Sequence, residues 1–351
     1  MRVELLQILR CPSCGGTLEL TDGETEGKDV VAGGLDCSGA ERHRFHIRDS
    51  VPRFVPTRNY ADNFGFQWNK FRLTQLDSFS GTSISRDRFF SSTGWDPTEM
   101  AGKRILDVGC GAGRFTEIAL STGAEVVALD YSSAVEACFA NNAGKGRLDC
   151  IQANIYELPF ARGSFDFVYC LGVLQHTPDV ERAFAALATQ LAPAGGLAVD
   201  VYPSLWRNVA SGKYWVRPIT KRIAPTKLFR LVETIVVPIL LPVSDLVARI
   251  PVLGRKLRHF LPVSNYRGVF PLSPAQLREW AVLDTYDMLA PAYDQPQSAK
   301  ALRRWFEKQG FDEVEVFRKG HLIGRGRRRS VVGTPRVGRE ATSRRQPRQR
   351  A

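Results

Sequence analysis

A short apolar stretch that runs into a glycine-rich turn is the feature that most constrains the fold of this chain. Residues 104–108 (RILDV) have the composition of a buried strand and lead directly into residues 109–113 (GCGAG). Residues 114–120 then carry apolar side chains at helical spacing. A strand, a glycine turn and a helix in this order begin a βαβ unit, in which the helix N-terminus can hold a ligand that approaches the glycines closely. The sequence therefore predicts an α/β fold with a ligand site at this turn.

An acidic residue after the next strand indicates what kind of ligand this is. Residues 125–129 (EVVAL) form a second apolar strand that ends at Asp130, 23 positions after Asp107. A carboxylate at this place can accept hydrogen bonds from both hydroxyls of a ribose, so any nucleoside-containing cofactor fits. A dinucleotide is disfavoured because its pyrophosphate would lie at a helix start that already has an acid, Asp107, beside it.

Later motifs extend this pattern and resemble a known family. The turn from Asp107 to Gly113 resembles motif I of class I S-adenosylmethionine-dependent methyltransferases. Residues 151–160, 164–171 and 174–179 resemble, in the family's order, the segment after its third strand, its fourth strand and the loop that follows. A helix over residues 298–309 and a hairpin turning at residues 319–320 are similar to the elements that end the family's sheet. The resemblance implies a doubly wound, mostly parallel sheet of seven strands.

The resemblance also implies a set of cofactor-binding residues. It places Asp107 near the cationic methionine portion of S-adenosylmethionine and Asp130 at the ribose. Asn154 stands where the family usually has an acid that contacts the adenine amino group, and its side-chain carbonyl can still accept that bond. The expected cofactor-binding residues are Asp107, Gly109, Cys110, Gly111, Gly113, Asp130, Tyr131, Asn154, Ile155, Leu171 and His176.

Two side chains are candidates for a direct catalytic role. Methyl transfer mainly requires that a nucleophile is aligned behind an activated methyl group and that water is excluded, although a general base helps if the nucleophile carries a proton. His176 follows the fourth strand at the carboxyl edge of the sheet and has a suitable pKa, and Tyr202 after strand five is the second candidate. The competing interpretation of His176 is a structural histidine that bonds the loop backbone.

The N-terminal segment predicts a zinc site. Cys11 and Cys14 form a C-x-x-C turn followed by two glycines, a spacing that points two thiolates at one ion. Cys37 is the nearest further cysteine, and spacing leaves His43 or His46 as the fourth ligand. The segment resembles Trm112-type zinc ribbons, and that resemblance aligns His43 with the ligand position. The expected ion is structural, because a closed four-ligand site leaves no position for a substrate; a metal-free ribbon is the alternative.

Charge and composition divide the chain further. Of the formal net charge of +12, residues 325–351 carry +9 and residues 203–271 carry +10, which leaves −7 for the rest. This uneven distribution argues against a surface that binds nucleic acid throughout. The expected organisation is a zinc-ribbon module (1–56), an aromatic linker or lid (57–101), the catalytic domain (102–202 and 272–324), a basic helical insertion (203–271) and a disordered Arg-rich tail (325–351).

The insertion after strand five allows three interpretations: a lid that recognises an acidic or lipid-linked acceptor, a surface that rests on anionic lipid, or a helical subdomain with no further role. No run of residues in the sequence approaches the ~20 apolar residues needed to span a bilayer, so no membrane-spanning helix is expected. It also shows no secretory signal, so a cytoplasmic protein, with peripheral membrane contact as one hypothesis, is expected.

Three functions follow as hypotheses. The leading one is a methyltransferase for a small-molecule, lipid-linked or glycan-linked acceptor. The second is an RNA base methyltransferase, because bacterial rRNA guanine methyltransferases have a similar ribbon and similar ligand types; the mixed charge of residues 1–56 and the absence of a Pro-Pro-aromatic signature in residues 171–176 argue against it. The third is a non-catalytic scaffold that keeps the fold. The intact glycine turn and Asp130 argue against it, because they indicate that cofactor binding is retained.

Overall fold

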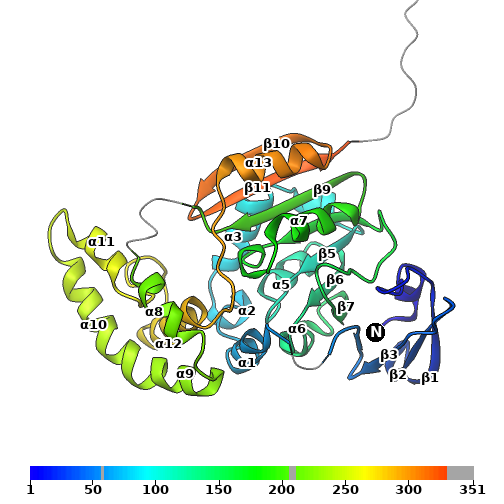
Figure 1. The fold of residues 1–351 in the computed structure, drawn as a ribbon, viewed down its shortest axis with the longest axis horizontal. Helices are drawn as coiled ribbons and strands as arrows, with labels where there is room; N and C mark the ends of the chain where they lie inside the picture. The colour runs from blue at the N-terminus through cyan, green and yellow to red at the C-terminus, as the bar shows by residue number, and fades with distance from the viewer. Residues whose placement is uncertain (57–58, 205–210, 330–351) are drawn as a thin grey trace, which may run out of the picture.

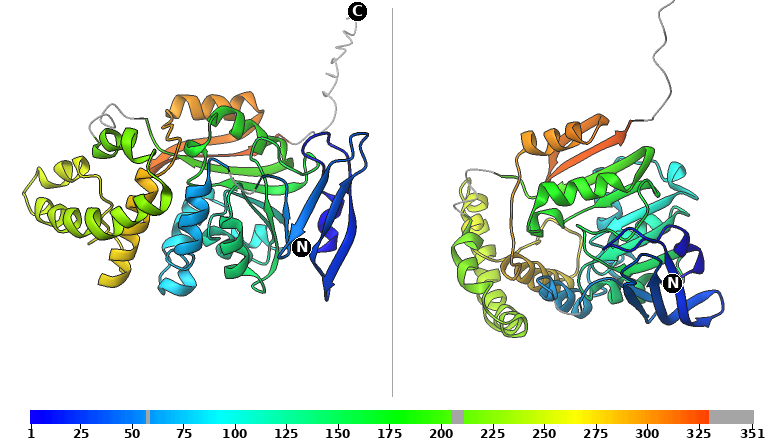
Figure 2. Two further views of the ribbon diagram at one scale, coloured as in Figure 1. Left: turned by 60° about the horizontal axis from the view of Figure 1, so that its bottom comes forward. Right: turned by 45° about the vertical axis from the view of Figure 1, so that its right-hand side comes forward.

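The computed structural model describes residues 1–56, 59–204 and 211–329. Its centre is an 11-stranded sheet with the strand order β1-β2-β3-β4-β7-β6-β5-β8-β9-β11-β10. Helices cover both faces of the sheet, the N-terminal module lies at one end, strands β11 and β10 form the other, and a group of helices stands at the left of the view (Figure 1). The two turned views show the same arrangement (Figure 2). The predicted Arg-rich tail beyond residue 329 lies outside the described residues.

Seven of these strands confirm the predicted doubly wound sheet. Parallel pairing joins five of them, and the antiparallel β11 lies between β9 and β10. Because β5 and β6 pair from Arg104↔Glu125 to Val108↔Leu129, they end level with each other at the carboxyl edge. The strands are β5 (Arg104–Val108), β6 (Glu125–Asp130), β7 (Arg147–Gln152), β8 (Phe165–Cys170), β9 (Leu191–Val201), β10 (Phe311–Lys319) and β11 (His321–Arg328). Residues 325–328, expected in the tail, continue β11 instead, because they pair with both of its neighbours.

Two layers of helices bury the two faces of the sheet. On one face α7 (Val180–Thr189), the short η2 (Leu174–His176) and α13 (Ala299–Lys308) share a core with the even-numbered side chains of β5, such as Leu106. On the other face α3 (Ile84–Thr93), α5 (Arg114–Leu120) and α6 (Ala134–Asn142) pack against Ile105 and Val126. Alternate strand residues therefore serve opposite layers, as expected for a sheet buried on both sides.

The N-terminal module extends the sheet instead of standing apart from it. It consists of η1 (Val3–Gln7), β1 (Leu18–Glu26), β2 (Asp29–Cys37), β3 (Arg44–Arg48) and β4 (Val51–Arg53). Strand β4 pairs parallel to β7 at Arg53↔Gln152. The Arg2 guanidinium donates two hydrogen bonds to the buried Asp149 carboxylate of β7, at 3.0 and 2.8 Å. These contacts fix the module on the catalytic domain, a placement that the sequence did not predict.

Residues 59–101, predicted as an aromatic linker or lid, form four helices. They are α1 (Asp62–Lys70), α2 (Asp77–Ser80), α3 and α4 (Pro97–Met100). Helix α1 packs beside α6, and α3 packs beside α5. The segment is therefore part of the helical layer nearest the glycine turn.

The insertion is a helical subdomain built on α12 (Pro274–Leu289). Its elements are α8 (Gly212–Thr220), α9 (Pro225–Leu231), the π-helical η4 (Val232–Val236), α10 (Val237–Ala248), α11 (Gly254–Leu257) and η5 (Arg258–Phe260). Leu228, Val232 and Leu241 share a separate core with Ala281 and Tyr286 of α12. This subdomain stands beside the sheet, at the left of Figure 1.

One expectation about the insertion was wrong. Residues 225–248 form a continuous helix of 24 residues that is long and apolar enough to cross a membrane, with mean hydropathy 2.0 in its most apolar window. Pro238 and Pro242 suggest an interruption in the sequence, but Pro238 follows directly on the π-helical η4 as the second residue of α10, Pro242 lies inside α10, and the helix continues through both. A membrane-length helix is therefore present in the described chain.

Candidate functional site

A cavity of about 1490 Å³ opens at the carboxyl edge of the parallel strands. The glycine turn, the ends of β6, β7 and β8, helices α1 and α3, the insertion and α12 all contribute to its wall. Pockets for drug-sized ligands are typically ~300–1,000 Å³. The volume therefore leaves room for a nucleoside cofactor and a second molecule beside it.

The glycine turn has a backbone that other residues adopt only with strain. Gly109, Gly111 and Gly113 have φ angles of 80°, 53° and 84°. A Cβ at Gly109 would come within 2.4 Å of Val173, and one at Gly113 within 2.3 Å of Asn142. The side chain of Trp68 lies 3.2 Å from the place of a Gly111 Cβ, so the indole covers the turn closely. These glycines are needed for the turn itself and for the approach of its neighbours.

Asp130 links the glycine turn to the cavity. Its Oδ2 atom accepts a hydrogen bond from the Gly111 N–H at 3.0 Å, and its Oδ1 atom accepts two from Ser132, at 2.8 Å from N and 2.7 Å from Oγ. Burial raises the pKa of the Asp130 carboxyl, while these donors lower it. The side chain is held by three donors and still lines the cavity, as a ribose-binding acid must.

The structure brings most of the predicted cofactor residues together. The cavity wall contains Gly109, Cys110, Gly111, Asp130, Tyr131, Ile155, Leu171 and His176. Asp107, Gly113 and Asn154 are not part of this wall. The Asn154 side-chain carbonyl accepts a hydrogen bond from the Tyr156 N–H at 3.1 Å, so the oxygen expected at the adenine is already engaged.

Asp107 lies beneath the turn. Its carboxyl accepts a hydrogen bond from the Thr116 hydroxyl at 2.6 Å and is 3% exposed. Burial raises its pKa to about 8, so the carboxyl is protonated near neutral pH. In this geometry Asp107 supports α5 against β5, in place of the cavity contact that the resemblance implied.

Helix α1 and Tyr60, two residues before it, bring aromatic rings to the cavity. Tyr60 packs against Tyr131 with ring centroids 5.0 Å apart, and Phe64 lies 5.4 Å from His176. Both rings and Trp68 line the cavity wall. The aromatic residues predicted as a lid therefore cover the glycine turn and the loop after β8.

One ring nitrogen of His176 is hydrogen-bonded, and the other has no partner among the described residues. Its Nδ1 atom lies 3.0 Å from the Tyr293 carbonyl oxygen, which can only accept, so Nδ1 carries the proton. Its Nε2 atom is buried and has no hydrogen-bond partner among the described residues. Tyr202 packs edge-on to His176 at 5.5 Å. Burial raises the pKa of the Tyr202 phenol, so this side chain is a neutral hydroxyl and not a ready base.

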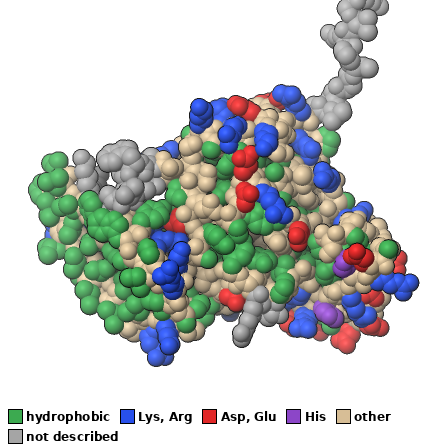
Figure 3. All heavy atoms as spheres, in the orientation of Figure 1, with side chains coloured by type: hydrophobic (Ala, Val, Ile, Leu, Met, Phe, Trp, Pro, Cys, Tyr) green, Lys and Arg blue, Asp and Glu red, His purple; other side chains and the backbone are tan. Residues whose placement is uncertain are grey.

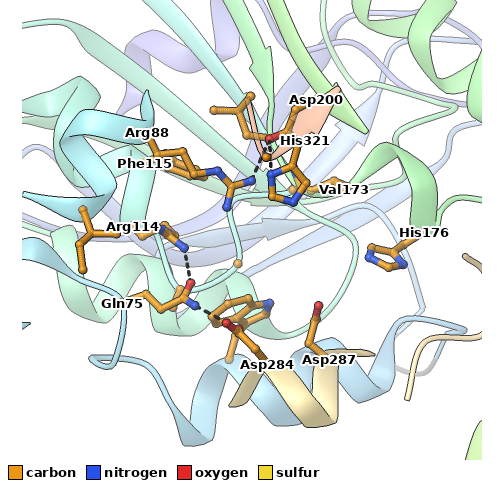
Figure 4. A pocket seen from close by; sticks show the side chains of 18 of the residues that line it. Gln75, Arg88, Arg114, Phe115, Val173, His176, Asp200, Asp284, Asp287 and His321 are labelled. Carbon is orange, nitrogen blue, oxygen red and sulfur yellow. Dashed lines mark hydrogen bonds and ion pairs between the residues drawn. The ribbon is translucent and has the colours of Figure 1, made fainter. Parts of the chain in front are cut away.

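A group of charged side chains also lines the cavity (Figure 4). Arg88 of α3 donates to Asp200 of β9 at 2.8 Å, and Asp200 is 1% exposed. The positive charge of Arg88 and the Gly172 N–H outweigh burial and lower the pKa of Asp200. His321 at the start of β11 lies 3.8 Å from Asp200, and burial lowers its pKa to about 4, so it is neutral.

A second polar group lies opposite, across the same space. Arg114 of α5 donates to Gln75, and Gln75 donates to Asp284 of α12 at 3.2 Å. Tyr266 of the insertion donates to the other oxygen of Asp284, whose pKa burial raises to about 6. Asp287, one helical turn farther along α12, also faces the cavity (Figure 4).

The sequence-based prediction missed these charged residues. Asp200 had a visible signal, because it is the one acid in the apolar segment 197–201 that ends strand five. Arg88 and Asp284 had none, since both lie on helices where a charged residue is ordinary. Only the fold brings them to the cavity, from positions 196 residues apart.

The predicted metal ligands also converge. The ligand atoms of Cys11, Cys14, Cys37 and His43 all lie within 4.8 Å of one another. The Gly39 N–H donates to the Cys37 sulfur at 3.2 Å, and a Cβ on Gly39 would lie 2.8 Å from the Cys14 sulfur. Three sulfurs and one nitrogen at this spacing fit tetrahedral zinc. His46 is exposed on β3 and does not belong to the cluster, which settles the choice between the two histidines.

Comparison with known families agrees with this division of the chain. Residues 106–199 match the methyltransferase domain family, and residues 2–50 match the Trm112p-like protein family. The two matches correspond to the glycine-turn domain and to the module that carries the metal ligands.

Individual relatives are similar over parts of their length. An uncharacterized protein of Synechococcus sp. is 31% identical over 243 residues, which cover 64% of this chain and 52% of that protein. A ubiquinone biosynthesis O-methyltransferase of Marinobacter nauticus is 32% identical over 143 residues, covering 33% of this chain and 60% of the relative. A solved magnesium protoporphyrin IX methyltransferase of Synechocystis has a TM-score of 0.42 at 15% identity and covers 77% of this chain and 97% of its own. The chain spans about half the length of the curated relatives it matches.

Proposed function

We propose that this chain, which joins a Trm112p-like module to a class I methyltransferase domain, transfers a methyl group from S-adenosylmethionine to a small-molecule, lipid-linked or glycan-linked acceptor. One observation carries the proposal. A single cavity is lined both by the glycine turn with Asp130 and by charged residues of α3, α5, β9 and α12. The first region suits the cofactor and the second suits the acceptor.

The residues at the glycine turn fit the cofactor. The close backbone of Gly109 and Gly111 leaves space for its amino-acid part, and Asp130 is placed to accept bonds from its ribose. Trp68 and Phe64 cover this region and exclude water from it. When bound, S-adenosylmethionine supplies a methyl group already activated by its sulfonium, so the chain mainly has to position the acceptor and exclude solvent.

His176 is the side chain best placed to take a proton from the acceptor. The bond from Nδ1 to the Tyr293 carbonyl fixes the ring and leaves the buried Nε2 lone pair available. A hydroxyl acceptor would lose its proton to Nε2 as its oxygen forms the new bond to the methyl carbon, while the sulfur–methyl bond would break with its electron pair left on sulfur. Tyr202, with its phenol protonated, would orient the acceptor by a hydrogen bond.

The charged region has both signs of charge within one wall. Arg88 and Arg114 offer guanidinium groups from α3 and α5, and Asp284 and Asp287 offer carboxyls from α12. Side chains of this kind select a polar acceptor rather than an apolar one. The insertion contributes residues such as Lys213 and Tyr266 to this wall.

The test is transfer of tritiated methyl groups from S-adenosylmethionine into a cell lysate, followed by separation into small-molecule, lipid, RNA and protein fractions. We expect label in the small-molecule or lipid fraction, and a strong loss of label with His176→Ala. Tyr202→Phe is the matched comparison and should retain more activity. Label confined to RNA would support the RNA base methyltransferase instead, and failure of the chain to bind S-adenosylmethionine in calorimetry would support the scaffold.

A further inference from the structure

Exposed apolar side chains are concentrated on the insertion. Among the described residues, the large hydrophobic side chains outside it that are exposed are Val3, Phe79 and Tyr293. Within it they are Trp215, Ile219, Ile235, Ile239, Val243, Leu246, Ile250, Val252, Leu253, Leu257, Phe260 and Val269. The space-filling view shows hydrophobic side chains gathered over α8–α11, at its left (Figure 3). Monomeric soluble proteins rarely expose a continuous apolar area of this kind without a partner.

The helix at the centre of this area is apolar on both sides. One side carries Leu228, Val232 and Leu241, which are buried against α12. The other side carries Ile235, Ile239, Val243 and Leu246, and Ile250, just beyond the helix, continues this spacing; these five side chains are 40–64% exposed. A soluble amphipathic helix would have polar residues along this second side. The exposed stripe therefore requires an apolar environment.

The way the helix packs shows that it lies along a surface. Its buried side contacts α12, and the cavity is lined by the segment that follows it, from Leu261 to Pro271. Asp245 is ion-paired with Arg267 on the protein side. A helix held along one side by a globular domain is suited to lie in the plane of a bilayer interface, with only its outer side in the apolar layer.

The charged residues beside the exposed stripe indicate whether a lipid or a protein surface covers it. Lys221, Arg222, Lys227, Arg230 and Arg249 are exposed on the same helices, whereas Glu233 is the exposed acid among residues 211–254. Anionic lipid attracts basic residues beside a membrane, by about 1 kcal/mol for each. Two of these five residues are lysines, in which protein–protein interfaces are depleted. Trp215, which packs beside Phe260 at 6.2 Å, adds an aromatic side chain of the type enriched at the lipid–water boundary.

We propose that the insertion is a monotopic docking surface for an anionic bilayer. The stripe from Ile235 to Ile250 and the turn at Val252 and Leu253, of which Val252 is 93% exposed, enter the acyl boundary. The basic residues lie at the level of the lipid phosphates. This inference does not depend on the proposed methyl transfer, because it rests on the outer surface of the insertion alone.

Vesicle flotation with the full chain tests the proposal. Vesicles of phosphatidylcholine alone are compared with vesicles that also contain phosphatidylglycerol, at low and high salt. We expect binding to the mixed vesicles that weakens with salt. Ile239→Glu and Leu246→Glu should each weaken binding by about tenfold or more, because each moves a charge into the apolar layer. Lys227→Gln should weaken binding to the mixed vesicles by about fivefold.

Phe79→Glu is the matched control, because Phe79 is 55% exposed on α2, outside the insertion. It should leave vesicle binding unchanged. Circular dichroism and thermal melting of all variants should match the unsubstituted chain, since only exposed side chains change. The proposal is overturned if the chain binds neither type of vesicle, or if Phe79→Glu weakens binding as much as Ile239→Glu. It is equally overturned if the chain forms a dimer that Ile239→Glu separates while vesicle binding is absent.

Discussion

Replacing Asp130 with asparagine tests the cofactor site at the residue that connects it to the glycine turn. The substitution keeps the size of the side chain and removes its charge. In the structure Oδ2 accepts from Gly111 and Oδ1 from Ser132, so the new amide NH₂ must face one of these donors. One donor is left without an acceptor, which should lower the free energy of unfolding by about 1–3 kcal/mol.

The effect on cofactor binding should be larger. The two hydrogen bonds from the ribose hydroxyls to a carboxylate would be reduced to at most one neutral hydrogen bond, which should lower the binding free energy by about 2–4 kcal/mol. This corresponds to a dissociation constant roughly 30-fold to 10³-fold weaker. Titration calorimetry with S-adenosylhomocysteine measures it, and circular dichroism shows whether the variant is folded. Because burial raises the pKa of Asp130, affinity in the unsubstituted chain should also fall as pH decreases through that raised pKa.

Ser132→Ala is the control. It removes one of the two donors to Oδ1, at 2.7 Å, but leaves the carboxylate and its bond to Gly111 in place. Stability should fall by about 1 kcal/mol, while affinity for S-adenosylhomocysteine changes by less than about fivefold. A folded Asp130→Asn variant with the affinity of the unsubstituted chain, or equal losses in both variants, would refute the assignment of Asp130 to the ribose.

Three further predictions address other parts of the molecule. Burial raises the pKa of Asp107 to about 8, above its unfolded value of about 3.9, so ionisation of this carboxyl lowers the stability of the folded chain as pH rises. Relative to the unsubstituted chain, the free energy of unfolding of Asp107→Asn should therefore increase by about 1.4 kcal/mol between pH 7 and pH 9, measured by thermal melts. A stability difference between the two proteins that does not change with pH would contradict this. His43→Ala should lose bound zinc and melt at a lower temperature, whereas His46→Ala should retain zinc by native mass spectrometry; equal loss in both would exclude the assigned ligand set. Arg88→Met leaves the buried Asp200 carboxylate without its ion pair and should lower the free energy of unfolding by about 2–4 kcal/mol, measured with denaturant at neutral pH. The double variant Arg88→Met/Asp200→Asn should recover part of this stability. An unchanged stability of Arg88→Met would show that the pair is not structural.

Much of the central fold could be predicted from local sequence. The strand at residues 104–108, the glycine turn and Asp130 lie within 27 consecutive residues, so one βαβ unit determines their relation. The zinc ligands are similarly determined by short turns, and Cys11 and His43 meet as expected. Local sequence patterns predict these features correctly because elements that are adjacent in sequence have few alternative ways to pair.

The remaining features depend on contacts between distant segments. The short strand β4 joins the module to β7 through a single registered pair, and its segment, Val51-Pro52-Arg53, has no pattern that specifies this partner. Asp107 is not part of the cavity wall, and its carboxyl accepts a hydrogen bond from the Thr116 hydroxyl of α5, the helix that follows the glycine turn. The long helix of the insertion was missed because Pro238 and Pro242 resemble breaks, although both can be accommodated within it.

The most direct measurement of the central claim is a crystal structure of the chain with S-adenosylhomocysteine. We expect the adenosine at the carboxyl edge of β5 and β6, with its ribose hydroxyls on Asp130 and its amino-acid part against Gly109 and Gly111. A ligand bound elsewhere, or a glycine-turn cavity that accepts a nicotinamide dinucleotide and not S-adenosylhomocysteine, would contradict it.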